Sequence, residues 1–294
     1  MNKVGFIGVG IMGKSMVRNL MKAGFELHIY ARTKSKVEDV IGEGAQFHES
    51  IKDCVQDCDA VITIVRFPQD VQEVYFDEGN ILDSAKKGAY LIDMTTTSPQ
   101  IAEKIYEEGT KRGFHVMDAP VTGGDTGAKA GTLSILVGGG KEDYEACMPL
   151  FEAMGTNINY QGKAGCGQHC KLANQIMIAG TLSGVCEALT YAKEQGLDPE
   201  VFMKSVATGA AGSKQLDTFG PKILKDDYAP GFFMKHFIKD MKLALIEANR
   251  KGLSLDVLSM VLANYEELEQ EGYGDLGTQA LMKFYDEEHR NTEE

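Results

Sequence analysis

The segment Val4–Gly13 reads VGFIGVGIMG and decides the fold of the first half of the chain. It begins as an apolar strand, turns through glycine and enters a helix that continues through Leu20. In this order the first glycine permits a tight turn, the second lets the backbone approach a pyrophosphate, and the third lets helix and strand pack closely. The pattern favours a dinucleotide site at the helix N-terminus over a purely structural turn. The residues predicted to bind it are Gly8, Val9, Gly10, Ile11, Met12 and Gly13.

Short apolar runs alternate with amphipathic stretches from Lys3 to about Gly140, and this alternation predicts the fold class. The runs are rich in β-branched or aromatic residues, as strands are. Strict alternation of strand and helix implies a mostly parallel, doubly wound α/β sheet with helices on both faces. The predicted strands are Val4–Gly8, Phe25–Tyr30, Ala60–Val65, Tyr90–Asp93, His115–Asp118 and Leu133–Gly138.

Beyond about Gly165 the strand pattern ends and helical periodicity continues almost to the C-terminus. Apolar residues recur every three or four positions over residues 169–195, which predicts one long helix that ends at Gly196. Three further helices are predicted to begin near Pro199, Lys235 and Ser254.

A length of 294 residues exceeds what one hydrophobic core normally serves, so two domains are expected. We predict a dinucleotide-binding Rossmann-type domain over residues 1–163. An all-helical domain for substrate binding and oligomerisation would follow over residues 164–294, beginning with the long interdomain helix. Only residues Glu287–Glu294 have the composition of a solvated tail.

The composition disfavours several classes of partner. A net charge of −13 opposes contact with nucleic acid or with an anionic membrane surface, and no cluster of basic residues compensates for it. We therefore expect a small-molecule partner. A carboxylate-bearing substrate would need a few local Lys, Arg or backbone N–H groups against this overall field.

The N-terminal segment and the cysteines predict a cytoplasmic protein. No basic region followed by a long apolar run and a cleavage site stands at the N-terminus, and no stretch approaches the length needed to span a bilayer. Six cysteines in a chain of this length fit reduced thiols. Cys166, His169 and Cys170 lack a fourth ligand nearby and the usual thiol spacing, so we predict packing roles and no metal site.

The end of the second predicted strand bears on the choice of cofactor. An NAD-specific site would carry Asp or Glu about twenty residues beyond the first glycine. Tyr30 stands there instead, and Arg32 and Thr33 follow. Because a guanidinium suits bidentate contact with a 2′-phosphate, the sequence favours NADP. In the alternative, Arg32 is a loop charge or stacks on the adenine of an enzyme that still accepts NAD.

Four further segments, together with the glycine turn, make the chain similar to the 3-hydroxyisobutyrate dehydrogenase family of β-hydroxyacid dehydrogenases, which includes tartronate semialdehyde and glyoxylate reductases. The resemblance covers nearly the whole chain and implies a second domain like the C-terminal domain of 6-phosphogluconate dehydrogenase. The segments are Asp93–Pro99, Asp118–Gly124 with Gly127–Leu133, Gly165–Asn174 and Lys239–Asp240.

Lys171 and Asn174 lie three residues apart near the start of the long helix, on one face. The resemblance implies that the Lys171 ammonium protonates the substrate oxygen in reduction, and that the neutral amine accepts the hydroxyl proton in oxidation. Asn174 would orient the same group. Without the motif, a lysine on an acidic protein would be interpreted as a solvated surface charge.

Thr122, Gly123 and Gly124 follow a predicted strand. Adjacent glycines there can leave backbone N–H groups free to hold a carboxylate, although a plain turn would use the same residues. The resemblance implies the carboxylate site. It also places Lys239 near the nicotinamide and the substrate, where it would supply positive charge, with a Lys239–Asp240 surface pair as the alternative. Adjacent helical residues do not face one another, so we expect a separate structural task for Asp240.

The same resemblance implies further cofactor contacts, and the chain departs from the family pattern at three positions. Thr122 stands where serine is usual, which adds a methyl group and narrows the choice of substrate. Ala31 replaces a common asparagine before the arginine, and Gln175 replaces a frequent second asparagine, which we expect to matter least. The further cofactor contacts are Val65, Arg66 and Thr96.

The sequence thus predicts reversible hydride transfer between NADP(H) and C3 of a small 3-hydroxy acid, without a metal. An imine reductase is one alternative, but relatives with that chemistry usually lack a lysine at the position of Lys171. Decarboxylating 6-phosphogluconate dehydrogenase needs a larger helical domain, and a non-catalytic NADP-binding protein would not need Lys171 and Asn174. A homodimer or homotetramer is expected, because the relatives form them.

Overall fold

The structure, a computed structural model, describes residues 1–285 and divides into two compact units. The first unit is Met1–Lys171 and the second begins at Leu172. The predicted boundary between residues 163 and 164 precedes the long helix α10 (Cys166–Glu194), whereas the division falls inside it. The predicted tail, Glu287–Glu294, lies outside the described residues.

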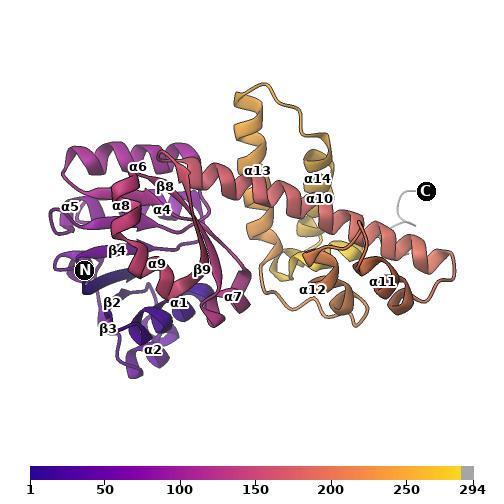
Figure 1. The fold of residues 1–294 in the computed structure, drawn as a ribbon, viewed down its shortest axis with the longest axis horizontal. Helices are drawn as coiled ribbons and strands as arrows, with labels where there is room; N and C mark the ends of the chain where they lie inside the picture. Colours follow the sequence, from indigo (N-terminus) through magenta and orange to yellow (C-terminus); the bar gives the residue numbers. More distant parts are fainter. Residues whose placement is uncertain (286–294) are drawn as a thin grey trace. The chain divides into compact units, whose positions relative to one another are not determined.

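The first unit contains a nine-stranded sheet in the order β3-β2-β1-β4-β5-β6-β8-β7, with β9 paired to β8 (Figure 1). The strands from β3 to β6 are parallel, β8 is antiparallel to β6 and β7, and β9 is parallel to β8. The strands are β1 (Lys3–Ile7), β2 (Glu26–Tyr30), β3 (Gln46–His48), β4 (Ala60–Thr63), β5 (Tyr90–Asp93), β6 (His115–Asp118), β7 (Val121–Thr122), β8 (Leu133–Gly139) and β9 (Gly155–Gly162).

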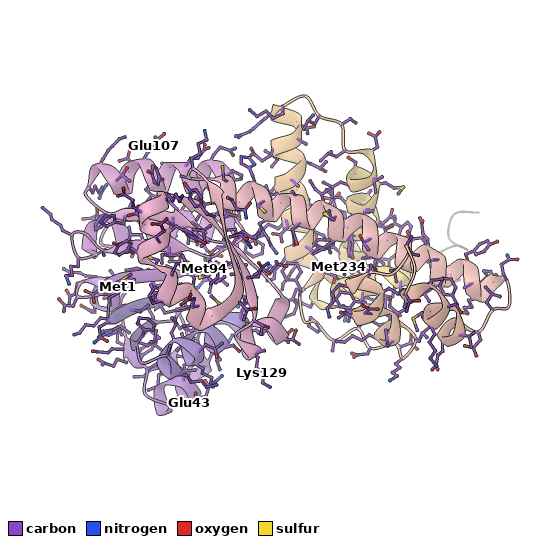
Figure 2. The ribbon with its side chains drawn as sticks, in the orientation of Figure 1. Met1, Glu43, Met94, Glu107, Lys129 and Met234 are labelled. Carbon is purple, nitrogen blue, oxygen red and sulfur yellow. The ribbon has the colours of Figure 1, made fainter. Side chains whose placement is uncertain are left out.

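Helices cover both faces of this sheet, as the alternating pattern predicts. One apolar core lies under α1, α2, α7 and α9, and it includes Met94, which follows β5 and is labelled in Figure 2. A second core lies under α3, α4, α5 and α6. The helices of this unit are α1 (Ile11–Lys22), α2 (Glu38–Gly42), α3 (Ile51–Val55), α4 (Pro68–Phe76), α5 (Ile81–Ser84), α6 (Pro99–Lys111), α7 (Gly124–Ala130), α8 (Lys141–Ala146) and α9 (Met148–Met154), with a 3₁₀ turn η1 (Lys34–Lys36).

All six predicted strands are present, and three strands were not predicted. Strands β3 and β7 have three and two residues, too few to show a period. Strand β9 reads GTNINYQG, and most of its residues are exposed or half-buried at the end of the sheet. Its Gly and Asn residues are typical of loops, so the edge strand is set by pairing with β8 and not by its own pattern.

The second unit is helical and packs around one apolar core, which includes Met234 at the start of α13 (Figure 2). The long helix and the helices near Pro199, Lys235 and Ser254 are confirmed. Helix α12 was not predicted, because its Gly-Pro pair at 220–221 usually breaks helices. The elements after α10 are α11 (Pro199–Ala207), α12 (Lys214–Ile223), α13 (Met234–Arg250), α14 (Asp256–Gln270) and the 3₁₀ segments η2 (Tyr273–Asp275) and η3 (Thr278–Tyr285).

Helix α10 corrects one expectation from the sequence. Among residues 1–285, this one helix is long and apolar enough to cross a membrane by length and composition. The expectation that no stretch reaches that length was therefore wrong. Its residues Leu172, Ala179, Leu182 and Leu189 are nonetheless buried in the helical core, which accounts for its apolar composition without a membrane.

Candidate functional site

The glycine turn between β1 and α1 has the geometry that the sequence predicts. Gly8 has a φ of +98°, and a Cβ there would collide with the Ile64 carbonyl oxygen and lie 3.3 Å from Val65 Cγ1. A Cβ on Gly13 would collide with the Gly8 carbonyl oxygen, so the helix and the turn are packed together. A Cβ on Gly10 would meet nothing within 4 Å. The first and third glycines therefore serve packing, and the second leaves open space above the turn.

The N-terminus of α1 can accept an anion. Its N-cap, Gly10, contributes no side-chain hydrogen bond, and the first turn holds no acidic residue. Backbone N–H groups at a helix start attract phosphate when no side chain satisfies them. Together with the space beside Gly10, this arrangement fits a dinucleotide pyrophosphate. Of the two flanking residues, Val9 is buried and Ile11 is 58% exposed.

Val65 and Thr96 belong to two neighbouring loops, and Thr95 of the second loop bonds to the first. Strand β4 lies beside β1 in the sheet, so the Val65 loop at the end of β4 lies next to the glycine turn at the end of β1. In doubly wound sheets, ligands bind at such a place, where the chain connections after two neighbouring strands lead to opposite faces of the sheet. The Val65 N–H donates to Thr95 Oγ1 at 2.9 Å. Thr96 therefore follows a residue that is fixed to the first loop, while Arg66 is exposed.

Arg32 lies beyond β2, as predicted, and it has a carboxylate partner. Its side chain is 62% exposed, and its Nη2 lies 3.1 Å from Asp70 Oδ1. Asp70 is in the first turn of α4, where its Oδ2 accepts a hydrogen bond from the Phe67 N–H at 3.0 Å. Sequence reasoning missed Asp70. A 2′-phosphate on Arg32 would have to compete with this carboxylate or displace the guanidinium from it. Thr33 is exposed beside Arg32.

The turn after β7 has the backbone that a carboxylate site needs. Gly123 and Gly124 have φ of +130° and +65°, values that L side chains rarely adopt. Thr122 is half-buried at the end of β7, paired with Ser134 of β8. Because both glycines have a left-handed backbone, their N–H groups do not point along the hydrogen bonds between strands. This geometry fits both interpretations from the sequence, a carboxylate site and a plain turn.

Lys171 is buried, in contrast to the surface charge that its residue type alone suggests. The whole residue is 7% exposed, and it lies within the second turn of α10. The first turn of that helix is held by Asp118 at the end of β6. Asp118 Oδ1 accepts from the Gly165 N–H and Oδ2 from the Gln168 N–H, both at 2.8 Å. Burial raises the pKa of Asp118, and these two N–H groups oppose that rise.

Asn174 lies in the second unit, in a buried chain of polar groups that the sequence did not indicate. Asn174 Nδ2 donates to Gln175 Oε1 at 2.8 Å, and Gln175 Nε2 donates to Asp240 Oδ2 at 2.7 Å. Gln175 is 2% exposed. That its replacement of asparagine matters least stays a prediction, and the structure adds that Gln175 connects Asn174 to Asp240.

Lys239 and Asp240 also differ from the sequence-based expectation. The Lys239 Nζ lies 2.9 Å from Asp240 Oδ1, so the two adjacent residues do pair. Adjacent residues on a helix point in different directions, but a lysine side chain is long enough to bend along the helix and reach the carboxylate of its neighbour. Asp240 is buried and Lys239 is half-buried, with side chains 1% and 13% exposed. Asp240 balances the Lys239 charge, and its bond to Gln175 is the separate structural task predicted for it.

No group of three or more His, Cys, Asp or Glu side chains in the described part of the chain could hold a metal ion. Cys166 and Cys170 are half-buried free thiols at the start of α10, and His169 beside them is exposed.

Asp93, at the end of β5, predicts how the stability of the fold depends on pH. Burial raises its pKa from 3.8 to about 6, although Thr63 Oγ1 and the Thr95 N–H donate to its Oδ1. The folded state therefore binds this proton more tightly than the unfolded state does. The ionised carboxyl lowers stability above about pH 6, and the penalty of roughly 3 kcal/mol is relieved as the pH falls to about 4.

Asp93→Asn removes this titration and tests it. The free energy of unfolding of the wild type, minus that of the variant, should rise by roughly 2 to 3 kcal/mol between about pH 7 and pH 4. Urea unfolding of both proteins at each pH measures the difference. A difference that stays constant with pH would contradict the assignment to Asp93.

Comparison with known proteins identifies the family. Residues 3–162 match the NAD binding domain of 6-phosphogluconate dehydrogenase, and residues 165–285 match the NAD-binding domain of NADP-dependent 3-hydroxyisobutyrate dehydrogenase. The chain therefore belongs to the 3-hydroxyisobutyrate dehydrogenase, or β-hydroxyacid dehydrogenase, family, and it is an NAD(P)-dependent oxidoreductase of that family. The predicted family and fold class are confirmed.

Individual relatives match over almost their full length. The chain is 48% identical to the uncharacterized oxidoreductase YkwC of Bacillus subtilis, covering 96% of this chain and 98% of that protein. It is 33% identical to the NAD-dependent L-serine dehydrogenase of Pseudomonas aeruginosa, covering 97% and 98%. The structure of Mycobacterium tuberculosis 3-hydroxyisobutyrate dehydrogenase with L-serine is similar at a TM-score of 0.88 and 26% identity, covering 96% and 98%.

Proposed function

We propose that the protein catalyses reversible oxidation of a 2-substituted 3-hydroxypropanoate to its semialdehyde, with NADP as the preferred hydride acceptor. The observation that carries the proposal is the buried Lys171, held by its helix one turn before Asn174 and outside the surface environment of an ordinary lysine. A buried amine can exchange a proton with a substrate hydroxyl, which general acid–base catalysis requires. Buried lysines are rare without such a task or a partner.

The family relationship and the residues together support the following steps. The N–H groups of Gly123 and Gly124, with the Thr122 hydroxyl, hold the substrate carboxylate. The neutral Lys171 amine accepts the C3 hydroxyl proton as the C3–H bond breaks. The nicotinamide, when bound, would supply the acceptor for the C3 hydride. The carbon–oxygen bond becomes a carbonyl. In the reverse direction the Lys171 ammonium returns the proton, and Asn174 orients the oxygen.

The names of the relatives support this substrate class. L-Serine and 3-hydroxyisobutyrate are both 3-hydroxypropanoates and differ only in the substituent at C2, an amino or a methyl group. The carboxylate site and the acid–base group would bind the carboxylate and the C3 hydroxyl that these substrates share. The pocket around C2 would then select among the substituents at that carbon. The methyl group of Thr122 favours the smaller substituents.

A substrate panel tests the proposal. Initial rates of cofactor reduction are measured with 3-hydroxyisobutyrate, L-serine, D-glycerate and the 2-hydroxy acid lactate, each with NADP and NAD. The 3-hydroxy acids should turn over and lactate should not, because its hydroxyl is one carbon closer to the carboxylate. Turnover of lactate alone, or of a cyclic imine in place of the acids, would overturn the proposal in favour of another reaction class.

The preference for NADP is tested at Arg32. Replacing Arg32 by Ala should lower the NADP-to-NAD ratio of kcat/KM by about 10- to 100-fold, the value of a charge-assisted contact with a 2′-phosphate. Asp70→Asn should raise the ratio, because the competing carboxylate is removed while the amide oxygen can still accept from Phe67. Ratios unchanged in both variants would show that Arg32 does not contact the phosphate.

We further propose that the protein assembles through its helical unit into a homodimer or homotetramer. Large apolar side chains are exposed on several helices of that unit, and exposed apolar groups often mark interfaces between subunits. Light scattering measures the mass, and a monomer would contradict this. The exposed residues include Met177, Val201, Ile246, Val257 and Met260.

A further inference from the structure

Gln168 is fully buried in the first turn of α10, and its side chain bridges to a loop more than seventy positions earlier in the chain. Its Nε2 donates to the Thr95 carbonyl oxygen at 2.7 Å, and its Oε1 accepts from the Thr97 N–H at 3.0 Å. A primary amide can make both bonds at once, since it carries a donor and an acceptor side by side. The loop is thereby clamped on both sides of Thr96.

The helix end of this bridge has little freedom to move. The Gln168 N–H is itself bound to Asp118, and Gly167 lies against the sheet so closely that a Cβ there would collide with the Leu136 carbonyl oxygen. A Cβ on Gly138 would lie 2.6 Å from Asp118 Oδ1. The turn of α10 that carries Gln168 is therefore fixed in translation and rotation by close backbone packing.

The loop end is fixed as well. Thr95 Oγ1 accepts from the Val65 N–H, and the Thr95 N–H donates to Asp93. The Gln168 bridge thus joins α10 to the Val65 loop, which packs against Gly8, through a continuous set of hydrogen bonds. Lys171 is three residues after Gln168, on the same face of the helix.

We propose that Gln168 is a positioning residue, which sets the Lys171 amine in register with the loop that carries Thr96. The proposal rests on the function proposed above, in which Lys171 exchanges the proton, and on the cofactor contact that the family resemblance predicts for Thr96. Gln168 touches neither substrate nor reacting atoms. Its effect is geometric, and displacements of about 1 Å at a reacting pair can cost about 100-fold in rate.

Gln168→Met removes both side-chain hydrogen bonds at nearly constant volume. We expect kcat to fall by about 10- to 100-fold, and KM for the hydroxy acid to change less than about threefold, since Gln168 has no bond to the Thr122–Gly124 turn. Gln279→Met is the matched control. Gln279 is also buried, and its Nε2 bonds the Asp227 and Ala229 carbonyl oxygens in the second unit. The control should lose thermal stability without losing kcat.

Gln168→Glu distinguishes positioning from a merely structural role, because only positioning predicts a kcat that depends on the protonation of the new carboxyl. An ionised carboxylate can still accept from Thr97 but cannot donate to the Thr95 carbonyl oxygen, whereas a protonated carboxyl can make both bonds. Burial raises the pKa of such a carboxyl. The kcat of this variant, divided by that of the wild type at the same pH, should therefore rise as the pH is lowered from about 8 to 5.

Three results would overturn the positioning role. They are a Gln168→Met kcat within twofold of the wild type, an equal loss of kcat in Gln279→Met, and a Gln168→Glu ratio that does not change with pH. If the methionine variant does not fold, the glutamate variant decides alone. Lys171→Ala separates this proposal from the function. Full activity of that variant would refute the acid–base role, whereas its inactivity beside a fully active Gln168→Met would refute positioning only.

Discussion

Lys171→Ala is expected to lower kcat by about 10²- to 10⁴-fold, the usual contribution of a general acid–base group. The affinity for NADPH should stay within about threefold, because we expect the glycine turn, and not this amine, to hold the pyrophosphate. Steady-state rates and fluorescence titration with NADPH measure the two quantities. The residue is only 7% exposed, so we expect that water does not replace the lost amine in the same position.

Lys193→Ala is the matched control for this variant, since Lys193 lies on the same helix and is exposed. It should retain the kcat of the wild type. If added methylamine partly restores the rate of Lys171→Ala, the lower rate of this variant is caused by the missing amine and not by misfolding. Full activity of Lys171→Ala would show that another group exchanges the proton.

Gly10→Ala is expected to weaken NADP binding by about 30- to 150-fold while leaving thermal stability unchanged. A methyl group at this position meets nothing in the protein, and Gly10 has a φ of −86°, which alanine adopts freely. It would instead occupy the space that the pyrophosphate needs, at a cost of about 2 to 3 kcal/mol. Isothermal titration with NADP and thermal unfolding without cofactor measure the two effects.

Gly13→Ala provides the contrast. Its Cβ would collide with the Gly8 carbonyl oxygen, so this variant should lose about 1 to 3 kcal/mol of stability even in the absence of cofactor. If Gly10→Ala bound NADP as the wild type does, the pyrophosphate would not lie over this turn.

Much of the first unit could be predicted from the sequence because its signals are local. The glycine turn Val4–Gly13 holds its strand, turn and helix within ten residues, and the apolar runs of the other buried strands are continuous. Strand β9 carries no such signal. It is polar and rich in Asn and Gly, and only its pairing with β8 makes it a strand.

Lys171, the proposed acid–base residue, and the residues around it were predictable to different degrees. Lys171 and Asn174 came from a recognisable motif, and Gln168 lies inside the same motif, three residues before Lys171. Its role depends on a loop at residues 95–97, and one sequence does not show such a distant contact. The bond between Gln175 and Asp240 could not be predicted for the same reason, because the two residues are 65 positions apart.

Isotope transfer tests the central claim most directly. The protein is incubated with NADP and 3-hydroxyisobutyrate that carries deuterium at both C3 positions, and the reduced cofactor is analysed by proton NMR and mass spectrometry. Hydride transfer from C3 predicts one deuterium at C4 of the reduced nicotinamide and deuterium in the aldehyde group of the product. Reduced cofactor without deuterium, or no reduction with any 3-hydroxy acid and either cofactor, would contradict the account.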